Sequence, residues 1–308
     1  MPRRIGARPV TVPKTDAPVA EAVKPKRVPR ARRPAAPPKL DGGAAKPGAP
    51  VQRNVYEVKE RKPETVDAAL EKLDQLAGVE VQPLGDIDGH AISVVRLNGA
   101  PPPPGVEPRR VLLSGGVHGS EPAGAIAAVE LIELIANHPE LFPGYEFTVV
   151  PLVNPEGFRD GTRANENDGK DLNREAEHDH DVPMEMQLVL PVLDEGPWAL
   201  ALDLHASGST TAAGKNGFFA IRTGGHGDLL HEVMSEFAKE HPVLDETTQK
   251  YTMVEARVMQ SQNEGTVKGY LYKTGTTAAF TLEAPARLDM RTQVDGLIDL
   301  VQGFLSKL

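Results

Sequence analysis

Apolar residues follow two different spacings once the chain passes residue 60. In residues 65–78 they recur every three or four positions, the spacing of one helix face, and Gly78 closes the segment as a C-terminal cap. The next segment, VEVQPLGDIDGHAISVVRLNG, indicates two short strands around the turn pair Asp88 and Gly89. Four prolines at 101–104 then exclude regular structure. We therefore predict an amphipathic helix and a hairpin that lead into the core.

From residue 111 onward, short apolar runs alternate with longer segments of helical periodicity. The predicted strands are 111–116, 147–155, 198–207 and 278–285. The predicted helices are 123–138, 227–241 and 292–308. Because strands that alternate with helices pair in parallel and are covered by helices on both faces, the pattern predicts an α/β fold.

Composition favours one globular catalytic domain preceded by a tail. Of the 308 residues, 40% are hydrophobic and 25% are charged, which is ordinary for a globular protein. The first 50 residues are different, because they hold 12 Lys or Arg against 3 Asp or Glu and are rich in Pro and Ala. Such a segment buries too little apolar surface to offset the entropy of ordering. We predict that residues 1–52 are a disordered tail and that 53–308 form the catalytic domain; a nucleic-acid contact through the basic tail is the less favoured alternative.

The chain lacks the features of membrane and disulfide-stabilised proteins. It has no apolar run of about 18 residues and no apolar stretch of a secretory signal, so we expect a cytoplasmic protein without a membrane partner. It also has no Cys. Any metal site must therefore use His and carboxylate ligands.

Polar side chains able to do chemistry follow four of the predicted strands. His118 and Glu121 follow the first strand, Asn154 closes the second, His205 the third and Glu283 the fourth. Because the ligand site of an open α/β sheet lies beyond the carboxyl ends of its strands, we expect these groups to converge.

The first pair, His118-x-x-Glu121, has the residue types of a zinc site. Glycines keep the surrounding turn thin, and Pro122 suits the first position of the following helix. His205 is the best candidate for a third ligand, because the other histidines lie in turns, loops or helices. A loop His and a strand-end His without a metal remain the alternative. Asp203 points to the same face as His205, either to orient it or as a polar residue at the edge of the core.

The segment 154–177 is dense in Gly, Asn and Asp, so it is an irregular loop directly after a buried strand. Arg163 and Arg174 offer cations for a carboxylate or an oxyanion, and Asn173 offers a further donor. A solvated surface loop is the equally weighted alternative.

Together these motifs resemble the zinc carboxypeptidase family over roughly residues 54–308. The resemblance rests on PLGDIDGHAISVVRL, GGVHGSEPAG, NPEGF, DLNR, LDLHAS and FTLEAP. It implies a single domain with a mixed, mostly parallel sheet of about eight strands and helices on both faces. It also implies one zinc ion per chain, Glu283 as the general base that activates the water at the metal, and a polarising arginine. The implied site residues are His118, Glu121 and His205 as zinc ligands, Asp171 behind His118, Arg163 as the polarising arginine, and Asn173 and Arg174 as a carboxylate clamp.

The implied function is a metallocarboxypeptidase that hydrolyses the C-terminal peptide bond of a peptide or small peptide-like substrate with a free carboxylate. Two alternatives stay open. The short loop between Arg163 and Asn173 resembles the aspartoacylase and succinylglutamate desuccinylase branch, which cleaves N-acyl amino acids, although only 25 residues follow Glu283, as in a carboxypeptidase. A catalytically silent carboxylate-binding module is the alternative from another class.

One departure concerns the family's mobile tyrosine, expected near Gln260 or Ser261, where the chain has none. Tyr270 and Tyr272 lie nearby, and we expect them to serve packing. By the same resemblance Val267 lines the specificity pocket with Lys268 beside it, so both apolar and acidic terminal residues fit.

Overall fold

The computed structural model describes residues 62–178, 181–255, 257–261 and 263–308, which belong to one compact unit. The predicted tail at 1–52 lies outside these residues. The strands are β1 (Val79–Ile87), β2 (His90–Asn98), β3 (Arg109–Gly115), β4 (Tyr145–Val150), β5 (Leu200–Ser207), β6 (Phe219–Arg222), β7 (Thr252–Glu255), β8 (Val258–Gln260) and β9 (Ala279–Pro285). The helices are α1 (Pro63–Leu73), α2 (Pro122–Asn137), α3 (Pro155–Asp160), α4 (Met184–Leu193), α5 (Gly227–Phe237), α6 (Val267–Lys273) and α7 (Met290–Lys307), with 3₁₀ turns η1 (Pro139–Leu141) and η2 (Leu172–Arg174).

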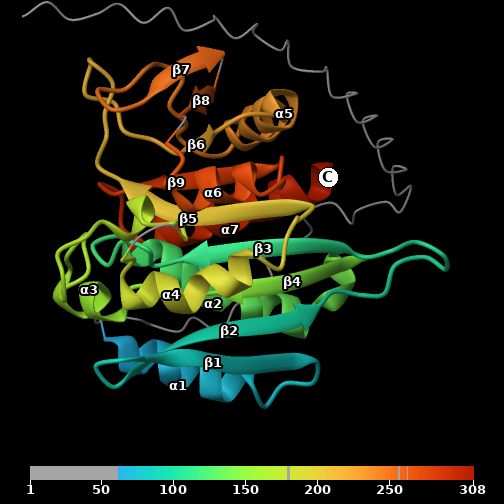
Figure 1. Cartoon of the computed structure of the whole chain (residues 1–308). Coiled ribbons are helices and arrows are strands. Elements are labelled where there is room, and N and C mark those ends of the chain that lie inside the picture. The colour runs from blue at the N-terminus through green and yellow to red at the C-terminus, as the bar shows by residue number, and fades with distance from the viewer. Residues whose placement is uncertain (1–61, 179–180, 256, 262) are drawn as a thin grey trace, which may run out of the picture. The chain divides into compact units, whose positions relative to one another are not determined.

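The described strands form one sheet in the order β1-β2-β4-β3-β5-β9-β6-β8-β7 (Figure 1). The four central strands β4, β3, β5 and β9 pair in parallel. Antiparallel strands continue the sheet on both sides, with the predicted β1–β2 hairpin on one side and β6 on the other. The prediction of a mixed sheet flanked by helices on both faces is confirmed.

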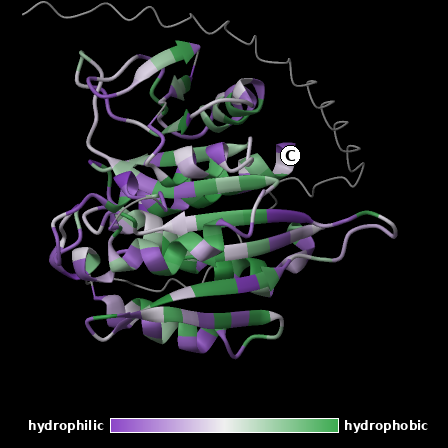
Figure 2. Cartoon of the chain, viewed as in Figure 1, coloured by the Kyte–Doolittle hydropathy of each residue, from purple (hydrophilic) through white to green (hydrophobic). Residues whose placement is uncertain are grey.

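Side chains alternate between two cores, one on each face of the sheet. Leu200, Leu202 and Leu204 of β5 pack into the core that contains α1, α2, α5 and α7. Ala201 belongs instead to the core that contains α4 and α6. Figure 2 shows the resulting run of hydrophobic residues along the central strands. Asp203 and His205 follow Ala201 at steps of two residues, so they point to the α4 and α6 face.

Two predicted segments end five residues earlier in the structure. The helix predicted over 65–78 ends at Leu73, and Gly78 lies in the turn before β1 with φ of +81°. The strand predicted over 147–155 ends at Val150.

Among the described residues no helix has both the length and the apolar character needed to span a bilayer.

Candidate metal centre

The turn between β3 and α2 is held tightly against the neighbouring loop. A Cβ atom at Gly119 would lie 1.8 Å from the carbonyl carbon of Gly157, so only glycine fits there. A Cβ at Gly124, in the first turn of α2, would lie 2.1 Å from the Leu204 oxygen of β5. These close approaches place His118 and Glu121 beside the end of β5. Glu121 is also the N-cap residue of α2, where the helix dipole favours a carboxylate.

His118, Glu121 and His205 bring one ligand atom each to a common point. These atoms all lie within 4.8 Å of one another. His205 Nδ1 lies 3.1 Å from His118 Nδ1 and 2.8 Å from Glu121 Oε2, while His118 Nδ1 lies 3.0 Å from Glu121 Oε1. Tetrahedral ligands about 2.1 Å from a zinc ion are about 3.4 Å apart. The three groups therefore have nearly the spacing of a zinc site.

Both imidazole rings are oriented by carboxylates on their other nitrogen. His118 Nε2 lies 2.9 Å from Asp171 Oδ1, and His205 Nε2 lies 2.7 Å from Asp203 Oδ2. A carboxylate accepts hydrogen bonds, so each Nε2 carries a hydrogen and directs Nδ1 inward. Because the two Nδ1 atoms face each other, positive charge is needed between the rings, as a proton or as a metal ion. The chemistry of the donor set thus fits a divalent metal.

The electrostatic field of these acids favours the same conclusion. Burial lowers the pKa of His205, but the charges and hydrogen bonds of Asp203 and Glu121 outweigh it and raise that pKa well above its usual value. Burial raises the pKa of Glu121, yet hydrogen bonds from His118 and His205 hold it well below the ordinary range. Negative charge on the acids therefore attracts a cation to this point.

Glu283 lies beside the group on the neighbouring strand. It is the register partner of His205 in the parallel β5–β9 pair, so both side chains point to the same face about 4.8 Å apart at the backbone. Its Oε2 atom is buried and has no hydrogen-bond partner among the described residues. Burial, followed by the charge of Glu121, raises the pKa of Glu283 to about 8. This carboxyl group is set to exchange a proton near neutral pH.

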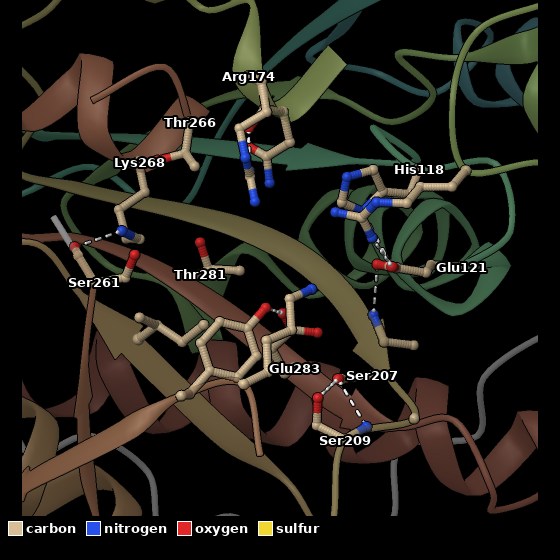
Figure 3. Close-up of a pocket in the computed structure, with 17 residues that line it drawn as sticks. His118, Glu121, Arg174, Ser207, Ser209, Ser261, Thr266, Lys268, Thr281 and Glu283 are labelled. Carbon is tan, nitrogen blue, oxygen red and sulfur yellow. Dashed lines mark hydrogen bonds and ion pairs between the residues drawn. The ribbon is translucent and has the colours of Figure 1, made fainter. Parts of the chain in front are cut away.

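A cavity of about 210 Å³ joins Glu283 to the candidate metal ligands His118 and Glu121 (Figure 3). Its wall also contains Arg163, Asn173 and Arg174. Among the described residues, Arg174 forms no ion pair with a carboxylate; its guanidinium donates to the backbone oxygen of Asn173. Arg174 can therefore receive an anionic ligand.

Two of the predicted residues have partners within the protein. Arg163 donates hydrogen bonds to Glu121 Oε1 at 3.2 Å and to Asp171 Oδ2 at 3.1 Å. It therefore holds in place both a candidate metal ligand, Glu121, and the acid that orients His118, Asp171. Asn173 accepts a hydrogen bond from the Val267 amide at 3.0 Å, and its Nδ2 lies 3.3 Å from His205 Nε2.

Asn154 does not join the group, contrary to expectation. Its side chain accepts a hydrogen bond from the Gly157 amide and caps α3, because the chain turns back after β4 ends at Val150. Asn154 does not line the cavity.

A comparison with models of protein families shows the family to which the chain belongs. Residues 107–290 match the succinylglutamate desuccinylase/aspartoacylase catalytic domain. The chain belongs to this family. The match covers the β3–α2 turn, the loop with Arg163 and Arg174, His205 of β5 and Glu283 of β9. Comparison with curated proteins gives no significant match.

Solved structures show that this family member has a carboxypeptidase-like fold. A candidate metallopeptidase from Shewanella denitrificans has a TM-score of 0.64 and 20% identity, with 79% of this chain and 89% of that chain covered. A metallo-carboxypeptidase from Burkholderia cenocepacia has a TM-score of 0.60 and 18% identity, over 79% and 68% of the two chains. Carboxypeptidase A from Helicoverpa armigera has a TM-score of 0.58 and 17% identity, over 80% and 72%.

One residue in the cavity wall of this family member was not predicted as a site residue by any sequence pattern. Tyr251 lines the cavity, and its hydroxyl lies 3.5 Å from Glu283 Oε1. Its ring packs against Phe219 with centroids 5.3 Å apart. Tyr270 packs instead in the α4 and α6 core and donates to Asp194, and Tyr272 is exposed. The tyrosine beside Glu283 thus comes from the segment before β7, where no pattern predicted a site residue.

Proposed function

We propose that this chain is a zinc-dependent hydrolase that cleaves an amide bond next to a free carboxylate. The first candidate reaction is hydrolysis of the C-terminal bond of a peptide or small peptide-like substrate. The observation that carries the proposal is the cavity whose wall contains the candidate metal ligands His118 and Glu121, the carboxyl group of Glu283 and the cation of Arg174.

In this proposal His118, Glu121 and His205 hold one zinc ion. When bound, the ion supplies a Lewis acid that polarises a carbonyl group and makes water more acidic. Asp171 and Asp203 hold the two imidazoles in the ligating tautomer. Arg163 keeps Glu121 in place and, from the cavity wall, would offer its remaining N–H groups to the carbonyl oxygen of the substrate.

Glu283 moves the proton. It takes a proton from the water whose oxygen attacks the carbonyl carbon, and it gives that proton to the amide nitrogen as the C–N bond breaks. The raised pKa supports this role, because it makes Glu283 a stronger base than an exposed carboxylate, while the positive charge of a bound metal ion would keep the group ionised before the reaction. The products are a carboxylic acid and an amine.

Arg174 selects the end of the substrate. Its guanidinium would bind the free carboxylate, with the Asn173 amide as a second donor, so that the adjacent amide bond lies at Glu283. A substrate without that carboxylate lacks this anchor.

A second candidate reaction uses the same residues on an N-acyl amino acid. The family match favours it, since the matching model is that of the desuccinylase and aspartoacylase catalytic domain. The cavity volume of about 210 Å³ is below the range of about 300 to 1000 Å³ for ligand pockets, which also favours a small substrate.

The test compares the zinc-loaded chain with its Glu283→Gln variant on blocked dipeptides and on N-acetyl and N-succinyl amino acids. We expect turnover of one class, a loss of several orders of magnitude in the variant, and equal zinc content in both proteins. The class that turns over decides between the two reactions. Full activity of the variant would remove Glu283 from the mechanism, and zinc and carboxylate binding without turnover of any substrate would favour a silent binding module.

A further inference from the structure

Two carboxyl groups from different elements meet beside α3, and neither of them lines the cavity. Glu156 is the second residue of α3, and only 2% of its surface is exposed. Its carboxyl group forms a hydrogen bond with that of Asp88, which lies in the exposed turn between β1 and β2. Asn167 Nδ2 donates a further hydrogen bond to Glu156 Oε2 at 3.0 Å. Because an ionised carboxylate only accepts hydrogen bonds, the bond between the two carboxyl groups requires a proton.

The charges around this pair do not neutralise it. In the part of the chain that the structure describes, neither Glu156 nor Asp88 forms an ion pair with a lysine or arginine. Arg159 of the same helix acts on both acids, but its guanidinium donates to both carboxylate oxygens of Asp160 at 2.9 Å. Glu185 of α4 adds a further buried acid, and its Oε1 atom has no hydrogen-bond partner among the described residues. The acids therefore repel one another unless one of them holds a proton.

Glu156 is the member of the pair that holds the proton. Burial, followed by the hydrogen bond and the charge of Asp88, raises the pKa of Glu156 from 4.5 to about 7. Asp88 is exposed, so water solvates its charge. The charge of Arg159 acts in the opposite direction but is outweighed, while that of Glu185 acts with burial. The two acids therefore titrate as a unit near neutral pH.

The helix that carries Glu156 supports the turn of the metal ligands. α3 packs against β2 of the hairpin and against α1. The residue after Glu156 is Gly157, and a Cβ atom at Gly119 would lie 1.8 Å from its carbonyl carbon. Gly119 lies between His118 and Glu121 in the turn between β3 and α2. The bond between the two carboxyl groups therefore joins the hairpin turn, through α3, to the turn of the metal ligands.

We propose that Asp88 and Glu156 share one proton and form a pH-sensitive latch between the β1–β2 turn and α3. The latch is closed at acidic pH and opens as the pH rises past neutrality, because two carboxylates in contact repel each other. The folded chain holds a proton that the unfolded chain, whose glutamate has the ordinary pKa of 4.5, releases. This stabilising contribution is therefore full below pH 4.5 and is lost as the pH rises through about 7. The latch does not depend on the reaction proposed for the cavity.

The test measures the folding equilibrium of the full chain by urea unfolding at pH 6 and at pH 8. The latch alone should reduce the folding equilibrium constant by about tenfold between these values, because the pKa of Glu156 is about 7 in the folded chain and 4.5 in the unfolded chain. Glu156→Gln has the shape of the protonated acid and offers an N–H group to Asp88. It should therefore not show this tenfold loss.

Two further variants complete the comparison, in which the titration of all other groups cancels. Asp88→Asn removes the repulsion from the other side of the pair, so it should reduce the loss in the same direction. Glu166→Gln makes the same chemical change as Glu156→Gln at an exposed acid of the neighbouring loop. It should keep the pH dependence of the wild type.

A second measurement follows the proton itself. Carbon NMR of the glutamate carboxyl groups in the wild-type chain should show one signal that titrates near pH 7 and is missing from Glu156→Gln. If Glu156→Gln does not fold, Asp88→Asn assigns the signal, which should then titrate at lower pH. A Glu156 signal that titrates below about pH 5, or a wild-type pH dependence of stability that both variants retain, would overturn the latch and leave the hydrolase proposal standing.

Discussion

Replacing Asp203 by Asn should weaken zinc binding although Asp203 is not a ligand. The carboxylate accepts two hydrogen bonds, each of 2.7 Å, from His205 Nε2 and from Ser114 Oγ. An amide has one oxygen, so its NH₂ group must face one of these two donors. If it faces His205, the ring hydrogen moves to Nδ1, the atom that points at Glu121. Loss of a hydrogen bond to a charged group costs about 1.5 to 3 kcal/mol, which corresponds to a roughly 10- to 100-fold weaker zinc affinity.

The assay is competition for zinc between the protein and a chromophoric chelator, at a fixed pH. Ser114→Ala is the matched control, because it removes the other donor and leaves the carboxylate on His205; its zinc affinity should fall by less than about fivefold. Both variants should unfold cooperatively near the wild-type temperature. If Asp203→Asn binds zinc within about twofold of the wild type, then Asp203 does not fix the His205 tautomer and the reasoning is wrong.

A further prediction follows from the turn between β3 and α2. Gly119→Ala should reduce zinc binding by at least about tenfold and lower the melting temperature, because its Cβ would lie 1.8 Å from the Gly157 backbone and the turn must move; unchanged values of both would contradict the tight turn.

The sequence predicted those parts of the fold whose strands are buried on both faces. Such strands are rich in apolar residues, as in β3, β5 and β9, and a polar residue able to do chemistry lies at or just after the end of each apolar stretch. Because parallel strands end at one edge, His118, His205 and Glu283 could be expected near one another before any coordinates. The hairpin could also be predicted, because the pair Asp88 and Gly89 is typical of its turn. Both residues adopt the positive φ that this turn requires.

Some of the remaining elements are too short to show a period of hydrophobic residues that would identify them as strands or helices. β6 has four residues and β8 has three, and β6 is stabilised by pairing with β9 on one side and β8 on the other. The helix α4 contains Pro191, which disfavours a helix interior, yet the helix forms because Met186, Val189 and Leu190 complete the core over the sheet. These elements depend on tertiary contacts that no local pattern contains.

The same limit applies to the site. The position of Tyr251 depends on the path of the segment before β7, so no spacing to Glu283 could have shown it. Similarly, the sequence offered both Val267 and Lys268 for the specificity pocket. Only the direction of the first turn of α6 distinguishes them, because Val267 packs in the α4 and α6 core while Lys268 lines the cavity.

The most direct test of the central claim is a titration of the metal-stripped full chain with zinc, together with its His118→Ala and His205→Ala variants. We predict one equivalent of zinc per wild-type chain and an affinity at least about 100-fold lower in each variant, with both variants folded. Zinc stoichiometry and affinity that are unchanged by these substitutions, or a folded wild-type chain that binds no zinc, would contradict the claim that these histidines and Glu121 form the metal centre.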